Sequence, residues 1–148
     1  MYKRQDDEAR KQLEAYKTDR YAKAKELLTI IEEKLPEAAA PYAIQIPQKM
    51  AQIYARIGIA TGDKEASAKA IELLEKEIMR YAGNVKYYQS LNPWQYATLP
   101  QTDRFIETYY MVYLLQDLGD IGGDPEKMVD RLTDMGVNFD RIVSILQQ

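Results

Sequence analysis

The chain has 148 residues, of which 46% are hydrophobic and 29% charged, and its formal net charge is -3. A domain of about 150 residues buries roughly 70% of its unfolded surface, so we expect one domain with a proper core. No stretch approaches the ~20 apolar residues of a membrane span, and the charge offers no basic face for nucleic acid, so we expect neither membrane insertion nor nucleic-acid binding. Cys and His are both missing from the sequence, which excludes disulfides and thiolate chemistry and removes the commonest general base and zinc ligand.

Two helices are predicted at the start of the chain. Residues 1–5 resemble the translated end of a sequencing adapter, and we expect them to be a non-native leader. Apolar residues at helical spacing then predict a helix over residues 6–17 and a second over residues 19–35, which Pro36 ends. We expect these two helices to pack as a hairpin.

The middle of the chain predicts another pair of helices. Apolar spacing indicates a third helix over residues 46–58, with Pro47 in its first turns, where a missing N–H costs little. Asp63 follows a turn and is a good N-cap for a fourth helix, which reaches at least Tyr81. Gly83 is a possible interruption of this helix but does not necessarily end it.

The second half begins with a Tyr-rich connector and continues with helices. Residues 92–101 carry no helical pattern, and Thr102 is a candidate cap for a fifth helix that is apolar almost all round and should be the most buried. Asp124 before Pro125 predicts the start of a sixth helix, and Asn138 predicts a short seventh. Aspartates around this last part make it acidic, but their spacing does not fit a calcium loop, and we expect no metal and no cofactor.

An internal repeat points to the fold. Residues 22–28 match residues 68–74 at six of seven positions, and we place each copy in the second helix of a hairpin. The offset exceeds the roughly 34 residues of a tetratricopeptide repeat, so the unit is a stretched relative. We therefore expect an all-α fold of antiparallel helix hairpins in a degenerate tetratricopeptide-like right-handed stack of six or seven helices. A generic helical bundle is the alternative. The repeat domain would cover residues 6–118, with residues 119–148 as an acidic helical extension packed on it.

One family shows a similar order of segments. A Tyr-Ala-Lys-Ala-Lys-Glu-Leu-Leu helix ends in Leu35-Pro36 and is followed by Pro41-Tyr42, by Ala51-Gln-Ile-Tyr-Ala-Arg-Ile-Gly58 and by Tyr87-Tyr-Gln-Ser-Leu91. Over roughly residues 12–118 this order resembles the soluble C-terminal tail of bacterial multi-pass membrane proteins of unknown function that are similar to protein O-mannosyltransferases. The resemblance implies a parent chain in the bacterial inner membrane, whose sugar-transfer chemistry would lie upstream. It does not extend beyond Gly119.

Aromatic side chains are the candidate contacts for a ligand or partner. The residues that we select are Tyr54, Tyr87, Tyr88, Trp94 and Tyr96. Aromatic rings with a polar tip suit a sugar or peptide groove, although core packing is the commoner role of such residues. For Trp94, the only Trp, two interpretations compete: a contact in a groove, or a buried plug at the end of the repeat stack, which we favour.

The sequence assembles no catalytic set. The carboxylate pairs Glu32–Glu33 and Glu75–Glu77 point to different sides of a helix, so we interpret them as surface charges. We therefore expect this segment not to be an enzyme. Two functions remain: a non-catalytic interaction domain of a membrane glycosyltransferase-like protein, which binds a partner protein or glycan acceptor, or a free-standing tetratricopeptide-like adaptor without membrane context.

Overall fold

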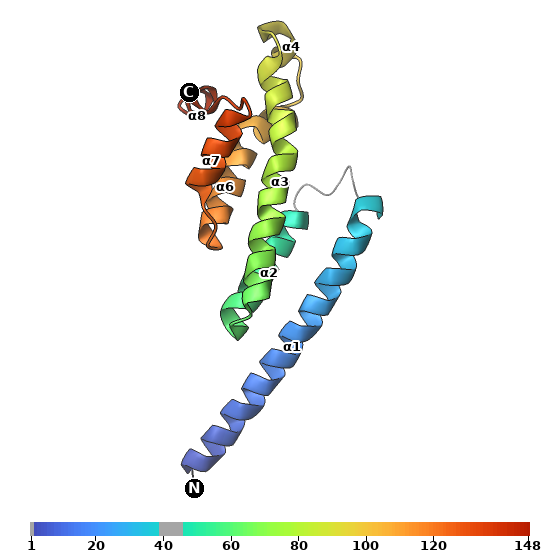
Figure 1. Cartoon of the computed structure of the whole chain (residues 1–148), viewed down its shortest axis with the longest axis vertical. Coiled ribbons are helices and arrows are strands. Elements are labelled where there is room, and N and C mark those ends of the chain that lie inside the picture. Colours follow the sequence, from blue (N-terminus) through green and yellow to red (C-terminus); the bar gives the residue numbers. More distant parts are fainter. Residues whose placement is uncertain (1, 39–45) are drawn as a thin grey trace. The chain divides into compact units, whose positions relative to one another are not determined.

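The protein is all-helical, as predicted. The computed structural model describes residues 2–38 and 46–148, and in this part it contains helices and no strand (Figure 1). The helices are α1 (Tyr2–Ala38), α2 (Ile46–Thr61), α3 (Lys64–Ser90), α4 (Pro93–Ala97), α5 (Gln101–Phe105), α6 (Met111–Asp120), α7 (Pro125–Asp134) and α8 (Phe139–Leu146). A π-helical turn, η1 (Ile106–Tyr110), joins α5 to α6 in one run. If that run counts as one helix, the described residues hold seven, within the expected range.

The chain divides into two compact units. Unit 1 comprises Met1–Lys69 and unit 2 comprises Ala70–Gln148, so α3 contributes its first turns to one and the rest to the other. We expected a single domain with a boundary between residues 118 and 119, and this division falls at a different place.

The predicted N-terminal hairpin is wrong, because α1 is one continuous helix of 37 residues. We had expected a break near residue 18, between the two predicted helices. Instead the Thr18 hydroxyl donates a hydrogen bond of 2.9 Å to the carbonyl of Glu14, one turn earlier, which is how Thr behaves inside a helix. No Gly or Pro interrupts this stretch. Pro36 is also not the end, because the helix continues to Ala38. The first copy of the sequence repeat therefore lies within α1 and not in the second helix of a hairpin.

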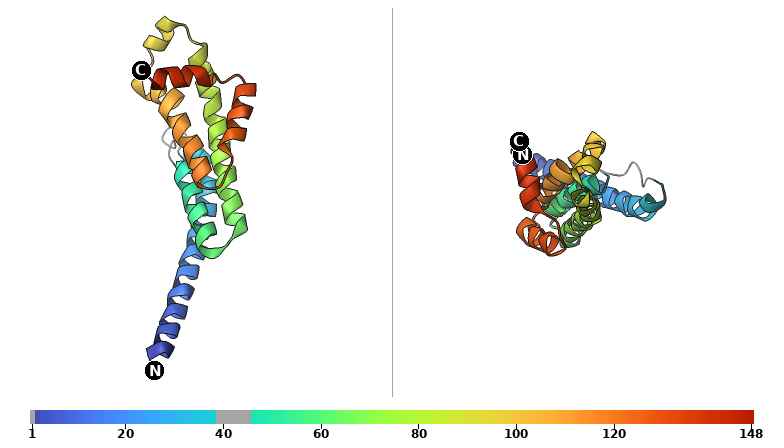
Figure 2. Two further views of the ribbon diagram at one scale, coloured as in Figure 1. Left: turned by 90° about the vertical axis from the view of Figure 1, so that its left-hand side faces the viewer. Right: turned by 90° about the horizontal axis from the view of Figure 1, so that it is seen from above.

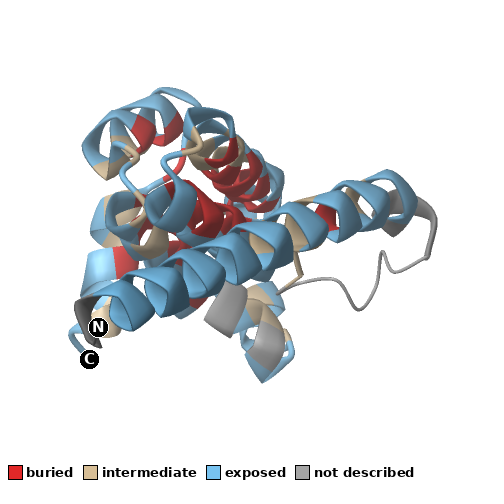
Figure 3. Cartoon of the chain, turned by 90° about the horizontal axis from the view of Figure 1, so that it is seen from below, coloured by how far each residue is buried: buried red, intermediate tan, exposed pale blue. Residues whose placement is uncertain are grey.

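Only a small part of α1 is buried. Between residues 4 and 34, Leu28 is the one buried side chain, and all residues from 4 to 20 are exposed. Figure 3 shows this as a helix that is exposed along most of its length. The predicted apolar stripe is thus covered only near Tyr21, Ala24 and Leu28, whereas Ile31 remains 44% exposed.

Ion pairs link α1 to the start of α3. Lys25 Nζ lies 2.9 Å from Asp63 Oδ2 and 3.7 Å from Glu65 Oε2, and Lys69 Nζ lies 2.7 Å from Glu32 Oε1. Asp63 also caps α3 as predicted, because its Oδ1 accepts a hydrogen bond of 3.1 Å from the backbone N–H of Ala66. The hydrogen bond from Lys25 and those from the backbone lower the pKa of Asp63, and the same bond to Asp63 raises the pKa of Lys25.

The chain reverses sharply between α2 and α3. Gly62, with φ of 72°, and Asp63 are the two residues outside helix at this turn. Just before it, Gly58 is buried against Ser67, and a Cβ at position 58 would overlap the Ser67 hydroxyl. The missing side chain therefore allows the two helix backbones to approach closely.

Unit 2 packs its helices around an apolar centre. Asp124 and Asn138 cap α7 and α8 as predicted, through hydrogen bonds from the backbone N–H groups of Lys127 and Arg141. Figure 2 shows α8 running at a steep angle to α6, and α8 packs against the π-helical turn η1. The largest fully buried apolar side chains of the unit come from four helices and are Leu74, Ile78, Val85, Met111, Leu114, Leu118, Leu132 and Ile142.

The predicted fifth helix differs in two respects. It begins at Gln101, one residue before Thr102, whose side chain lies outside the described part, and it contains the π-helical turn η1. It is also not buried all round, because Tyr109 and Tyr113 are each 49% exposed. One face, carrying Met111 and Leu114, forms part of the core.

Two of the helical glycines, Gly58 and Gly83, offer a paired test of this packing. We expect Gly58→Ala to lower the free energy of unfolding by about 1–3 kcal/mol, because the new methyl group overlaps Ser67. Gly83→Ala should instead raise it by about 0.5–1 kcal/mol, because Ala favours a helix and nothing lies within 4 Å of its Cβ. Urea denaturation of both variants measures the difference. The same sign for both would contradict the close contact at Gly58.

Candidate functional site

Four of the five selected aromatic residues surround one tight turn in unit 2. Tyr87 and Tyr88 lie on α3, which continues through them to Ser90, and Trp94 and Tyr96 lie on α4. The connector is therefore helical on both sides of the turn, not irregular as predicted. We call these four residues the aromatic corner.

A local capping motif makes α4 a defined helix despite its short length. Asn92 Oδ1 accepts a hydrogen bond of 2.9 Å from the Gln95 N–H, and Gln95 Oε1 accepts one of 3.1 Å from the Asn92 N–H. Pro93 fills the first helical position, where its fixed φ suits the helix. Trp94 therefore lies in the first turn of a helix whose start is fixed by this reciprocal cap.

The selected residues differ widely in exposure. Trp94 is 85% exposed and Tyr87 is 61% exposed, whereas Tyr88 and Tyr96 are half-buried. The favoured interpretation of Trp94 as a buried plug is therefore wrong. Tyr54 lies on α2 in unit 1 and is only 3% exposed, which makes it a core residue in this structure and leaves the ring little surface for a partner.

Two arginines lie over the ring of Tyr96. The guanidinium of Arg141 lies 4.8 Å from the centre of the Tyr96 ring, and that of Arg104 lies 5.5 Å from it. Arg104 also donates a hydrogen bond of 2.6 Å to the carbonyl of Ala97, in the last turn of α4. Such cation–π contacts fix the ring and, with it, the short helix that carries Trp94.

The support beneath Tyr96 is a fully buried carboxylate. Glu107 has no exposed surface and lies in the π-helical turn η1. Its Oε1 accepts a hydrogen bond of 2.8 Å from Arg141 Nε, while its Oε2 has no hydrogen-bond partner among the described residues. A buried carboxylate is costly unless a cation compensates it, so the pairing with Arg141 is a strong constraint on where α8 lies.

A second contact fixes the start of α8. The side-chain amide of Gln89, on α3, donates to the carbonyl of Asn138 at 2.9 Å and accepts from its N–H at 2.8 Å. Asn138 in turn caps α8 through the N–H of Arg141. Gln89 therefore places Arg141 opposite Glu107.

The environment of the half-buried tyrosines changes their ionisation. Burial raises the pKa of Tyr96, and the nearby Glu107 carboxylate raises it further. Burial likewise raises the pKa of Tyr88, with a further contribution from Asp103. Both phenols are therefore neutral at ordinary pH.

A further buried carboxylate lies on α3. Glu77 is 4% exposed, which corrects our interpretation of it as a surface charge. Arg80 Nη2 lies 3.2 Å from Glu77 Oε1, close enough for an ion pair but not aligned for a hydrogen bond. The rings of Tyr81 and Tyr110 meet edge to face beside this pair, with centres 5.0 Å apart. Burial raises the pKa of Glu77, and it also raises the pKa of Tyr110.

Sequence reasoning missed Glu107, Arg141 and Gln89. The one available signal was Glu107 itself, a charged residue inside an otherwise apolar helical stretch. Such a residue needs a buried partner, but 34 residues separate Glu107 from Arg141, and nothing local identifies the partner. The start of α4 could have been predicted more easily, because Asn92-Pro93 followed by Gln95 at the third helical position is a capping-box pattern.

Comparisons with known proteins identify no relative. The chain matches no family profile, no curated protein and no solved structure. Among the described residues, no three Asp or Glu side chains lie together in a way that could hold a metal ion. No helix in the same part of the chain combines the length and the apolar character that crossing a bilayer requires.

The Glu107–Arg141 pair can be tested by comparing two arginine variants. Arg141→Ala should lower the free energy of unfolding by about 3–5 kcal/mol, because it leaves the Glu107 charge buried without a cation. Arg104→Ala removes the other arginine over Tyr96 and should cost only about 1 kcal/mol. Thermal and urea denaturation measure both. If the two variants lose equal stability, Glu107 does not depend on Arg141.

Glu77 should make stability depend on pH. Its folded pKa lies above the ordinary value of 4.5, so the folded state binds this proton more tightly than the unfolded state. The resulting stabilisation is complete below pH 4.5 and is lost as the pH rises through the folded pKa. Glu77→Gln, which stays neutral, should therefore gain stability relative to the unaltered chain between pH 4 and pH 7, as measured by urea denaturation at both values. A difference that does not change with pH would contradict this account.

Proposed function

We propose that this chain is a non-catalytic helical interaction module that binds a partner protein through the aromatic corner. The observation that carries the proposal is the 85% exposure of Trp94 on a helix with a reciprocal cap. Large exposed aromatic side chains are costly to leave in water, and Trp and Tyr are the commonest anchors of protein interfaces.

The arrangement beneath the aromatic corner supports this proposal. Tyr96 is held by Arg104 and Arg141, and Arg141 is held by the buried Glu107. A surface that is already fixed loses little conformational entropy when a partner binds. We therefore assign the contacts with the partner to Tyr87 and Trp94, and a supporting role to Tyr88 and Tyr96. Tyr54 is left out of the contact set, because it is buried.

The proposal extends to the stacking of the helices. We propose that α1, α2 and α3 form a stretched tetratricopeptide-like unit. One observation that supports this is the sequence match between residues 22–28 on α1 and residues 68–74 on α3. The antiparallel course of α1 and α2 (Figure 1) and the close contact between Gly58 and Ser67 also support it. Small residues at helix contacts are a property of such repeats.

The wider context is also a proposal. On the resemblance described above, the module is the soluble C-terminal part of a glycosyltransferase-like protein of the bacterial inner membrane, with the chemistry upstream. The alternative is a free-standing adaptor. Sequencing the genomic DNA upstream of codon 1 distinguishes the two. An open frame with several apolar segments of ~20 residues supports the first, and a stop codon shortly upstream supports the second.

Trp94→Ala tests the aromatic corner. Peptides selected from a random display library against the full chain serve as the probe, and the fluorescence of the single Trp reports their binding to the unaltered protein. We expect Trp94→Ala to weaken peptide binding by at least about 2 kcal/mol, measured by calorimetry, because an interface anchor is removed. The free energy of unfolding should change by less than about 0.5 kcal/mol, because the indole is exposed.

Ile59→Ala is the matched control. Ile59 is 82% exposed on α2 in unit 1, so this variant also removes an exposed apolar side chain, but away from the aromatic corner in sequence. It should bind the selected peptides as the unaltered chain does. Equal binding by all three proteins would reject the aromatic corner as the contact. A Trp fluorescence response to glycans and not to peptides would replace the protein partner by a glycan acceptor.

A further inference from the structure

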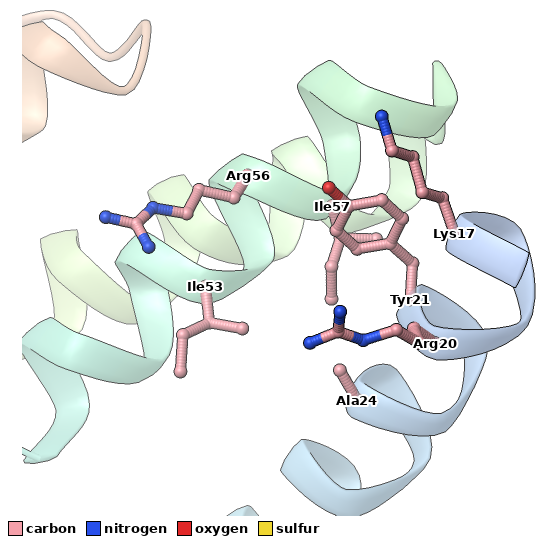
Figure 4. Close-up of a pocket in the computed structure, with 7 residues that line it drawn as sticks. All are labelled: Lys17, Arg20, Tyr21, Ala24, Ile53, Arg56 and Ile57. Carbon is pink, nitrogen blue, oxygen red and sulfur yellow. The ribbon is translucent and has the colours of Figure 1, made fainter. Parts of the chain in front are cut away.

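A second candidate site lies in unit 1, between α1 and α2. A cavity of about 350 Å³ opens there, and three cationic side chains line it: Lys17 and Arg20 from α1, and Arg56 from α2. Figure 4 shows Arg20 extending from α1 toward α2, with Lys17 and Arg56 on either side of it. The cavity volume falls in the range of small-molecule pockets.

Among the described residues, no carboxylate compensates the charges of this cavity, although the Arg20 guanidinium lies over the Tyr16 ring, 5.6 Å from its centre. Within the described residues, no carboxylate lies within ion-pair distance of Lys17, Arg20 or Arg56, and none lines the cavity. By contrast, Lys25 and Lys69 in the same unit pair with carboxylates. Three positively charged side chains thus line one cavity in a chain whose formal net charge is -3. Such a local concentration attracts an anion.

The remaining wall of the cavity is largely apolar. Tyr21 from α1 and Ile53 and Ile57 from α2 lie between the cationic groups. Ile57 is buried, whereas Ile53 is 39% exposed. The site therefore combines a cationic rim with an apolar surface on which carbon atoms of a ligand can rest.

We propose that this cavity binds an organic phosphate. The phosphate group of the ligand contacts Arg20 and the neighbouring cationic side chains, and the apolar part of the ligand contacts Ile53. A phosphate monoester carries nearly two negative charges near pH 7, which suits several cations better than a single carboxylate does. The planar guanidinium groups of Arg20 and Arg56 match phosphate oxygens in pairs. This site is independent of the aromatic corner, because its residues belong to the other unit.

Binding is tested on the full chain by NMR titration with hexyl phosphate, methyl phosphate and hexanol. We expect shifts at residues 17–24 and 53–57, and tighter binding of hexyl phosphate than of the other two. Arg20→Gln should weaken hexyl phosphate binding about tenfold or more, and Arg56→Gln should do the same from the opposite wall. Lys11→Gln removes a cation from α1 outside the cavity and should leave the affinity within about twofold. Circular dichroism checks that each variant is folded.

The phosphate could be part of a soluble compound or of a lipid head group, and a vesicle arm separates these sources. Sedimentation with phosphatidylcholine vesicles that contain phosphatidic acid, dependent on Arg20, identifies a lipid. Hexyl phosphate binding without vesicle association identifies a soluble ligand. The proposal is overturned if no phosphate shifts these residues, or if Arg20→Gln and Lys11→Gln bind hexyl phosphate equally.

Discussion

The arrangement of unit 2 depends on one buried charge. Glu107 is enclosed without any exposed surface, and Arg141 must reach it from a helix that lies 34 residues further along the chain. That requirement fixes α8, which the Gln89 amide also ties to α3. The guanidinium that satisfies Glu107 then lies over the Tyr96 ring, so the position of α4 follows from the same pair. An apolar pair could fill this space, but it would not fix the orientation of a ring as a directed guanidinium does.

Local signals in the sequence predicted the helix starts well. Asp63, Asp124 and Asn138 each cap the helix that they were expected to cap, because a cap depends on residues within one turn. The break that apolar spacing led us to expect near residue 18 does not occur, and there Thr18, a residue type that often caps a helix, bonds back into the preceding turn. A cap residue without a nearby Gly or Pro is thus weak evidence for a break in a strongly helical stretch.

Long-range features could not be predicted from one sequence. The exposure of Trp94 and the burial of Tyr54 depend on which helices cover them, and one sequence does not give these contacts. The partner of Glu107 could not be predicted either, because many arginines could have paired with it. The cavity between α1 and α2 required the course of α1, which we had expected to fold back on itself. What the sequence predicted correctly, an all-helical protein, follows from apolar spacing alone.

The double role of Asp63 has a consequence for the order in which unit 1 assembles. One carboxylate oxygen caps α3 only three residues away, and the other pairs with Lys25, which is 38 residues away. The cap and the Gly58–Ser67 contact are local, so the turn between α2 and α3 can form with little loss of chain entropy. Docking of α1 requires closure of a much longer loop, and it meets a carboxylate that the cap already holds in place. We therefore expect the α2–α3 turn to fold early and α1 to join it in a later, salt-sensitive step.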